Sequence, residues 1–457
     1  MKKNILLAVS VLLYIIFFIF GADWGLEIKA VGTLLIIQIL WIGRVFPLAF
    51  SSILLILLLS FHFTSYDEVL SYLGSSLVWL LFSTFILAHA FVRTGLAGRV
   101  ALSILNLAKG SSRLLLLLSF IMMFVLTVFI PSNIGKGKLT SDILDDLVKK
   151  LSEIQQTANL GKSFFIGTAY ISPISAAFVP TGASSTIYAF GMFSSVSGEM
   201  NYIHWLIYFS FPMLLFVFML WILFQIIFPI GDVDQKMVRK LVYSKKQMLG
   251  KWSKQEIKMA FIIALTLILW LTHAWHGYSI PLVGMLGAAL SVLPYIGVMD
   301  WDKARTAIDW DMMLFFGSTL MLSNVLIDTG AMNQFAAWIT GIFAHVHPVA
   351  VIVGLCLLIA LARLLFVNVL GFLTIALPLA LILGEQIAMF SSLEVAMAVY
   401  LVGIPGFLFI TQSPVHLITY AYGYYSQGDL FRTGIPAMAG WLIIVFLSIF
   451  FYWKLII

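Results

Sequence analysis

Charge and cysteine are both scarce in this sequence, and each scarcity excludes a class of protein. Charged residues make up 10% of the 457 residues and hydrophobic residues 62%, whereas soluble domains carry roughly 25% charged residues. With so little polar surface to face water, the chain is predicted to be an all-α polytopic membrane protein. Cys356 is the single cysteine, so no disulfide can form within the chain.

Catalytic and nucleotide-binding motifs are also missing from the sequence. It contains no His-Glu-x-x-His, no Gly-x-x-x-x-Gly-Lys-Ser/Thr and no cysteines at metal-binding spacing. An intramembrane hydrolase that used Ser132 would need a base beside it, and none is evident, so an enzyme is the least favoured function. The formal charge of +6 indicates no nucleic-acid partner, because the basic residues lie in loops beside apolar runs.

Long apolar runs are the main feature that the sequence does have. Runs of roughly 20 residues are long enough to cross a bilayer and to lie against membrane lipid, and about eleven are predicted to span it. They lie near 4–21, 30–43, 46–63, 74–92, 163–190, 202–230, 257–273, 280–297, 310–328, 394–425 and 431–455. Two further apolar stretches, 112–151 and 348–391, are interrupted near their middles. Each is predicted to form a re-entrant hairpin, which enters the membrane and returns to the same side.

The positions of the basic residues predict the orientation of the chain. The largest basic cluster lies in 231–257, which is predicted to be a solvated cytoplasmic linker; a lipid-binding or partner helix is the alternative. Counting spans back from this linker places Lys2 and Lys3 in the cytoplasm as well. Because the number of spans is odd, the two ends of the chain are expected on opposite sides of the membrane.

The sequence also contains a sparse internal repeat. At one constant displacement along the chain, polar and glycine positions of the first half fall on identical residues of the second half. The pairs are Ser83-Thr84 with Ser318-Thr319, Thr94-Gly95 with Thr329-Gly330, and Asn133 with Asn368. Such repeats are typical of secondary transporters, in which the substrate lies where the two repeats meet.

This repeat predicts the domain organisation. A first transmembrane helix occupies 1–29, and the first repeat occupies 30–230 with the hairpin 112–151. The basic linker 231–257 precedes the second repeat, 258–457, which contains the hairpin 348–391. Each repeat has an odd number of spans, so the second is predicted to be inverted relative to the first.

Breaks in the apolar runs predict the binding site. The hairpin tips lie at Ser132-Asn133 and at Asn368, and they are expected to meet near the middle of the membrane. Two spans are broken as well, at 180–185 and at 412–414. Backbone without helical hydrogen bonds is tolerated in a membrane only where it is buried in protein or lines a wet cavity. The predicted substrate-binding residues are Ser132, Asn133, Ile134, Thr181, Asn368, Val369 and Ser413.

Four ionisable residues lie near these breaks, and the sequence allows two roles for each of them. Lys136 and Lys138 either neutralise an anionic substrate, or reach the cytoplasm or pair with nearby aspartates. Arg363 is either a functional residue or one partner of an interhelical ion pair. His416 either carries a proton or contacts substrate, or it is a hydrogen-bonded packing residue. The sequence alone leaves all four assignments open.

Several stretches of the chain resemble the divalent anion/sodium symporter family. The matching stretches are 79–88 with 93–96, the hairpin tip 130–137, the second-half stretch 315–318, and the closing stretch 422–436. The resemblance implies a secondary transporter that carries di- or tricarboxylates by alternating access; a carrier of an inorganic oxyanion such as sulfate is the alternative. It further implies a homodimer in a bacterial inner membrane, with no cofactor other than coupling sodium ions.

The hairpin tips depart from the family pattern, which is Ser-Asn-Thr in both hairpins. Here the tips read Ser132-Asn133-Ile134 and Val367-Asn368-Val369, so most of the expected hydroxyl groups are missing. The residues that the resemblance implies for sodium are Ser132, Asn133, Gly182 and Asn368. Because hydroxyl oxygens are lost, sodium dependence is predicted to be weak, above all at the second tip, and exchange of one anion for another is the alternative form of coupling.

Overall fold

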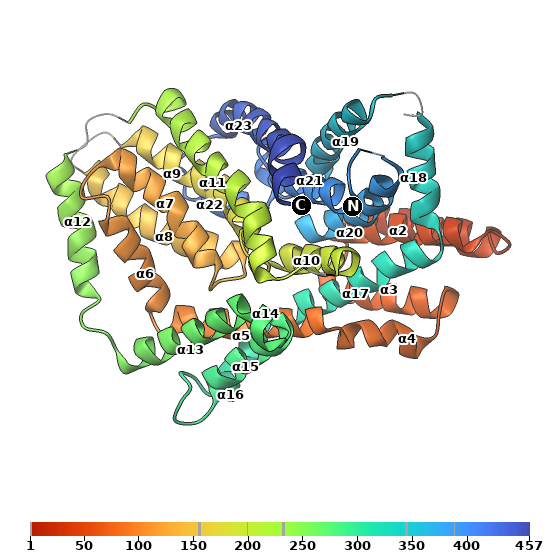
Figure 1. Ribbon diagram of the computed structural model, residues 1–457, viewed down its shortest axis with the longest axis horizontal. Coiled ribbons are helices and arrows are strands. Elements are labelled where there is room, and N and C mark those ends of the chain that lie inside the picture. Colours follow the sequence, from red (N-terminus) through yellow and green to blue (C-terminus); the bar gives the residue numbers. More distant parts are fainter. Residues whose placement is uncertain (1, 154–156, 199, 231–233, 343–345, 388) are drawn as a thin grey trace. The chain divides into compact units, whose positions relative to one another are not determined.

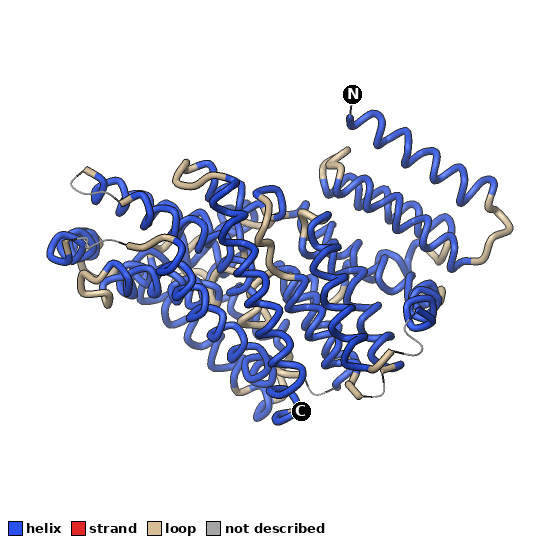
Figure 2. Tube along the Cα trace, turned by 90° about the horizontal axis from the view of Figure 1, so that it is seen from above, coloured by secondary structure: helices blue, strands red, loops and turns tan. Residues whose placement is uncertain are grey.

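The computed structural model describes residues 2–153, 157–198, 200–230, 234–342, 346–387 and 389–457. All regular elements in these ranges are helices, as Figure 2 shows, which confirms the prediction of an all-α polytopic membrane protein. Seven of the described helices are long and apolar enough to cross a membrane. Some predicted spans form shorter apolar helices instead, for example α3 (Leu48–His62) and α15 (Ile280–Val292).

The chain packs as two compact units, each built from segments that are far apart in the sequence. The first unit comprises Met1–Phe82, Tyr188–Glu199 and Asp309–Gly403. The second comprises Ser83–Ile187, Met200–Ile308 and Ile404–Ile457. Two of the boundaries fall inside helices, in α5 (Ser76–Arg93) and in α10 (Ser184–Ser197).

The first unit is organised around α17, which packs against α3 and α20. Ser318 on α17 donates a hydrogen bond to Ser52 Oγ at 3.0 Å, and the Phe315 ring lies 4.7 Å from that of Trp41. Helix α1 lies alongside α2 (Figure 2). The helices of this unit, besides α3, are α1 (Lys2–Tyr14, continued by a π-helical turn at Ile15–Phe20), α2 (Leu26–Ile42), α4 (Tyr66–Ser71), α17 (Trp310–Asp328), α18 (Ala331–Ile342), α19 (Pro348–Ala362), α20 (Val369–Gln386) and α21 (Ser392–Gly403).

The second unit is organised around α9, which is buried along almost its whole length. Helices α7, α8 and α22 pack against it, side by side in Figure 1. Most helices of the second unit begin after a Ser, Asn or Asp residue, whose side chain accepts hydrogen bonds from backbone N–H groups of the first turn. The helices, besides α15, are α6 (Leu96–Asn106), α7 (Ser112–Thr127), α8 (Asn133–Ser152), α9 (Ala158–Ala176), α11 (Tyr202–Ile227), α12 (Gln235–Met248), α13 (Lys254–Leu271), α14 (His273–His276), α16 (Trp301–Thr306), α22 (Pro414–Ala421), α23 (Gln427–Leu447) and α24 (Trp453–Ile456).

The same order of local elements occurs twice along the chain. A helix, a glycine with positive φ and a shorter helix form α5–α6 and α17–α18, with Gly95 at φ 86° and Gly330 at φ 76°. Only glycine adopts this conformation without strain, which explains why the repeat keeps it. Two consecutive helices and then a broken helix follow in both cases, as α7–α8 with α9–α10 and as α19–α20 with α21–α22. The division into repeats 30–230 and 258–457 stays a prediction from the sequence.

The two helix breaks lie somewhat earlier than predicted. The first covers 177–183 rather than 180–185, because Ser184 and Ser185 already belong to α10. The second starts at Ile404, eight residues before the predicted 412–414, and continues to Ser413, with one 3-10 turn at Ile410–Gln412. Proline disfavours helical backbone in the residue before it, so Pro405 ends α21 at Gly403.

Most of the basic segment 231–257 forms helix α12; residues 231–233 lie outside the described part of the chain. Its Val238 and Val242 are buried, while Lys236, Arg239 and Lys240 are exposed. Lys245 forms an ion pair with Asp146 of α8. The segment therefore has one packed face and one basic face open to solvent.

The predicted orientation can be tested by chemical labelling of introduced cysteines. In a Cys356→Ser background, a cysteine at Ser244 should be shielded from membrane-impermeant maleimide added to whole cells, because the basic cluster is predicted to be cytoplasmic. A cysteine at Lys454 should react, because the odd number of spans puts it outside. Both positions are exposed on the protein surface, so burial does not limit either reaction. The opposite labelling pattern would overturn the orientation.

Candidate functional site

The tip of the first hairpin starts helix α8. The hydroxyl group of Ser132 accepts a hydrogen bond from the backbone N–H of Gly135 at 3.1 Å and so caps the helix. The backbone carbonyl of Asn133 accepts one from Ser172 Oγ of α9, also at 3.1 Å. Asn133 Oδ1 is buried and has no hydrogen-bond partner among the described residues. Nearly all buried polar atoms in proteins have a hydrogen-bond partner. An amide oxygen that is buried without one is therefore a candidate to accept a hydrogen bond from a ligand or to coordinate an ion.

Lys136 lies one turn beyond the tip and is completely buried, with 0% of its surface exposed. Its Nζ atom donates a hydrogen bond to Thr127 Oγ1 at the end of α7. Thr127 Oγ1 in turn lies 3.2 Å from Ser175 Oγ, in the last turn of α9. Lys136 therefore neither reaches the cytoplasm nor pairs with Asp142 or Asp145.

Lys138 adopts the second of its two predicted roles. Its ammonium group donates to Asp142 at 2.8 Å and to the Tyr422 hydroxyl group at 2.7 Å. The Tyr422 hydroxyl group also donates to Asp142, so the three groups form a closed network between α8 and the residue that follows α22. Asp145 of α8 likewise accepts a hydrogen bond from the Tyr424 hydroxyl group at 2.8 Å. Acidic residues of α8 thus fix this helix against the segment that follows α22.

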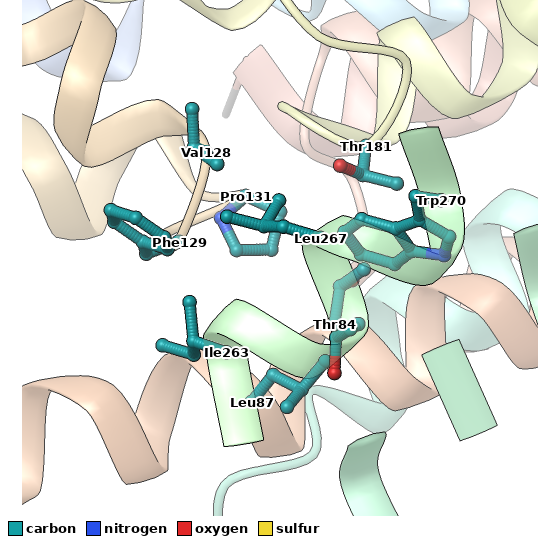
Figure 3. Close-up of a pocket in the computed structure, with 10 residues that line it drawn as sticks. Thr84, Leu87, Val128, Phe129, Pro131, Thr181, Ile263, Leu267 and Trp270 are labelled. Atoms are coloured by element: carbon teal, nitrogen blue, oxygen red, sulfur yellow. The ribbon is translucent and has the colours of Figure 1, made fainter. Parts of the chain in front are cut away.

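The first break brings residues 181 and 182 against the hairpin. A Cβ atom on Gly182 would lie 2.1 Å from the carbonyl oxygen of Ala176 and 2.7 Å from Thr127 Cγ2, so only glycine fits there. Thr181 is 2% exposed and lines a mostly apolar cavity with Pro131 of the tip. Figure 3 shows this cavity, which is lined by Thr84, Leu87, Val128, Phe129, Pro131, Thr181, Ile263, Thr266, Leu267 and Trp270.

The second break places the start of α22 against α8. Ser413 caps α22 by accepting a hydrogen bond from the backbone N–H of Val415 at 3.3 Å. A Cβ atom on Gly137 of α8 would lie 2.8 Å from Val415 Cγ1 and 3.7 Å from Ser172 Oγ. The N-terminal turns of α8 and α22 therefore adjoin the same part of α9. Helix N-termini carry partial positive charge, so this arrangement favours an anion.

His416 is buried in the first turn of α22. Its Nδ1 atom lies 3.1 Å from the carbonyl oxygen of Phe409, within the second break. Tyr170 of α9 supports the same segment, because its hydroxyl group lies 2.9 Å from the carbonyl oxygen of Phe407. Both side chains therefore hold the non-helical backbone of the break.

The tip of the second hairpin lies in the first compact unit. Asn368 caps α20 by accepting a hydrogen bond from the backbone N–H of Leu370 at 2.9 Å, and Val369 is the first residue of that helix. Arg363 is 2% exposed and donates to the carbonyl oxygen of Gly403, the last residue of α21, at 2.9 Å. It also donates to the carbonyl oxygen of Phe366.

The predicted site residues are thus divided between the units. Ser132, Asn133, Ile134, Thr181, Gly182 and Ser413 belong to the second unit, whereas Asn368 and Val369 belong to the first. Within the second unit, Asn133 and the start of α22 adjoin Ser172, and Ile134 is 49% exposed. That the two hairpin tips meet stays a prediction from the sequence.

Sequence reasoning missed the hydroxyl groups around the first tip. Thr127 contacts Lys136, Ser172 contacts Asn133, and Ser175 contacts Thr127. The hydroxyl groups of Thr140 and Ser141 are buried without a partner among the described residues. Ser172 and Ser175 are three residues apart, which places them on one face of α9. Hydroxyl residues on one face of an otherwise apolar helix were the signal that could have identified them.

A family model described as "Sodium:sulfate symporter transmembrane region" matches residues 1–457. The chain belongs to this family. The resemblance to divalent anion/sodium symporters is thereby confirmed, because the model describes the transmembrane region of that family. Members of the sodium:sulfate symporter family are described as transporters and not as enzymes, in agreement with the missing catalytic motifs.

Curated relatives in the sodium:sulfate symporter family are distant. A protein of Cupriavidus necator named "Membrane protein" is 22% identical over 271 residues, 58% of this chain and 53% of that protein. The sodium-dependent dicarboxylate transporter SdcS of Staphylococcus saprophyticus is 26% identical over 322 residues, 64% of this chain and 61% of that protein. SdcS of Staphylococcus aureus strain USA300 is 25% identical over 347 residues, 70% of this chain and 66% of that protein. The match to the first two relatives therefore spans less than two thirds of their length.

Proposed function

We propose that this chain is a secondary transporter of small organic anions, chiefly dicarboxylates, that works by alternating access. Three features of the second unit support this function. The N-termini of α8 and α22 adjoin α9 together, and Asn133 Oδ1 is buried beside them without a partner among the described residues. The backbone of 128–132 and 177–183 is non-helical. Broken helices whose N-terminal ends point at anionic groups are the usual substrate sites of secondary transporters.

The substrate class follows from the relatives rather than from the site. Carboxylates and sulfate present similar oxygen atoms to a helix N-terminus, and the family description names sulfate. Relatives named after their substrate, such as SdcS, are dicarboxylate transporters, so organic anions are favoured over sulfate. Tricarboxylates remain within the same proposal, because they present the same carboxylate groups.

The cellular setting is also part of the proposal. The chain is an integral membrane protein, and the bacterial origin of its relatives favours a plasma-membrane location. A homodimer is proposed from the family resemblance. Sodium ions are proposed as coupling ions by the same resemblance, with Ser132, Asn133, Gly182 and Asn368 as their ligands, and anion exchange is the alternative.

Counterflow in proteoliposomes tests the transport function. Vesicles that contain purified protein and unlabelled succinate should transiently accumulate external labelled succinate above its equilibrium level, whereas protein-free vesicles should not. The labelled compound should be recovered chemically unchanged, because a carrier moves its substrate without converting it. Parallel vesicles loaded with citrate or sulfate compare the anion classes. Absence of counterflow for every anion, in sodium and in choline buffer, would refute the proposed function, and preferential counterflow of sulfate would refute the substrate class.

A further inference from the structure

Helix α12 has a basic face on the side that points away from the rest of its unit. Lys236, Arg239 and Lys240 are exposed, and their spacing of three and four residues places them on one face of the helix. Val238 and Val242 are buried on the other face. The helix packs against α6 and α8, and Figure 1 shows it at the edge of the second unit with these two helices on one side. The three cations therefore project outward from the unit.

Contacts at both ends fix α12 in this orientation. A Cβ atom on Gly110, in the turn before α7, would lie 2.1 Å from the carbonyl oxygen of Gln235, the first residue of α12. At the other end, the guanidinium group of Arg99 in α6 donates to the carbonyl oxygens of Leu249 at 3.0 Å and of Gly250 at 3.1 Å. Both ends of α12 are thus held against the unit, and its basic face is a fixed part of the protein surface.

The charges on this face are not neutralised within the described part of the chain. Lys236, Arg239 and Lys240 form no ion pair with any residue there. The exposed Lys149 and Arg305, by contrast, each pair with an aspartate of their own helix. A group of exposed cations without internal partners attracts an anionic surface, because its field is not cancelled by nearby carboxylates.

The chain tethers α12 to the membrane surface at both ends. Helix α11, one of the helices long and apolar enough to cross a membrane, ends at Ile227, and α12 begins at Gln235. The seven residues between them reach at most about 25 Å. After Met248, five residues lead to α13, which begins at Lys254 and contains most of the predicted span 257–273. A helix tethered in this way lies close to the headgroup region of the bilayer.

Exposed aromatic residues accompany the cations. Tyr243 lies three residues after Lys240, on the same face, and is 52% exposed. Trp252, in the segment before α13, is 53% exposed. Tyrosine and tryptophan are enriched at membrane–water interfaces, where the ring meets the apolar side and the polar group meets water. Basic and aromatic residues together are typical of amphipathic helices that lie on anionic membranes.

We propose that the basic face of α12 binds the phosphate groups of anionic phospholipids in the adjacent membrane leaflet, which the orientation of the chain predicts to be cytoplasmic. Lys236 and Lys240 supply positive charge to the headgroups, and Arg239 has the planar fork that forms two parallel hydrogen bonds to one phosphate. Clusters of basic residues next to a membrane span commonly recognise anionic lipids in this way. Lipid binding at this face does not depend on which anion the chain transports.

Thermal melting of the purified full-length protein in a non-ionic detergent tests the lipid class. Phosphatidylglycerol should raise the melting temperature to a plateau, because a ligand that binds only the folded state stabilises it. Phosphatidylcholine with the same acyl chains should give no such rise, and neither should glycerol phosphate, which carries the phosphate without the chains. Equal effects of the two lipids, or of phosphatidylglycerol and glycerol phosphate, would overturn the inference.

Charge substitutions test the basic face directly. The double variant Lys236→Gln, Lys240→Gln should need at least roughly tenfold more phosphatidylglycerol for half of the rise, because each basic residue near an anionic surface adds to the attraction. The double variant Lys303→Gln, Arg305→Gln is the matched control. It removes the same charge from α16, where the two side chains are 50% and 62% exposed, and its half-point should stay within about twofold of wild type. An equal loss in both variants, or in neither, would contradict the assignment.

A fluorophore on α12 gives a readout that needs no charge variant. An environment-sensitive dye is attached to Ser244→Cys in the Cys356→Ser background, since Ser244 is exposed on this helix. In vesicles that contain phosphatidylglycerol, its emission should shift to shorter wavelength than in vesicles of phosphatidylcholine alone. Added salt should reverse the shift, because it screens exposed charges. The same emission in both kinds of vesicle would overturn the inference and favour a soluble acidic partner for the basic face.

Discussion

Replacement of Asn133 by alanine is expected to reduce anion counterflow by roughly 10- to 100-fold. The amide oxygen of Asn133 is buried without a partner among the described residues, next to the N-termini of α8 and α22. Loss of one buried hydrogen-bonding group costs about 1–3 kcal/mol, and about 1.4 kcal/mol corresponds to a tenfold change in affinity. Asn368→Ala is expected to act similarly, because the internal repeat places Asn368 at the equivalent tip.

The matched control for both variants is Asn201→Ala. Asn201 caps α11 by accepting hydrogen bonds from the backbone N–H groups of Ile203 and His204, so its loss weakens the start of that helix, and Asn201 is not one of the predicted site residues. Loss of such a cap costs about 0.5–2 kcal/mol of stability. Asn201→Ala should therefore lower the melting temperature without a comparable loss of counterflow. Normal counterflow in both Asn133→Ala and Asn368→Ala would exclude the tips as the binding site.

Replacement of Gly182 by alanine is expected to lower both stability and counterflow. The added Cβ atom would lie 2.1 Å from the backbone carbonyl oxygen of Ala176, so either the end of α9 or the break must shift. Insertion of atoms into a well-packed region typically costs about 1–3 kcal/mol. Because the break packs against Thr127, the same shift would disturb the contact between Thr127 and Lys136. The melting temperature and the counterflow rate of the purified variant check the prediction.

Gly98→Ala is the control for this substitution. A Cβ atom on Gly98 would have no neighbouring atom within 4 Å, and Gly98 lies inside α6. Alanine favours helix over glycine by about 1 kcal/mol, so this variant should be as stable as the wild type or more stable. A Gly182→Ala protein with unchanged melting temperature and counterflow would show that the break does not depend on the close approach.

The hairpins illustrate how far local sequence predicts this fold. The predicted stretch 112–151 is the pair α7–α8, Ser112–Ser152, because Pro131 and the capping hydroxyl group of Ser132 interrupt an otherwise continuous apolar run. Local signals also mark the turn between α5 and α6, where Gly95 has a positive φ. The second break was predicted at 412–414, too late in the chain, because Pro405 already ends α21 at Gly403.

The sequence by itself determined the membrane class, the family and the helix starts that Ser132 and Asn368 cap. These properties follow from composition, from helix length and from residues that cap or break a helix, all of which act over a few neighbouring positions. Only the tertiary structure decided the role of the charged residues. Lys136 and Lys138 are two residues apart in sequence, yet one is fully buried beside Thr127 and the other pairs with Asp142 and Tyr422. The environment of a side chain depends on which helices pack against it, and those contacts join residues that are distant in the chain.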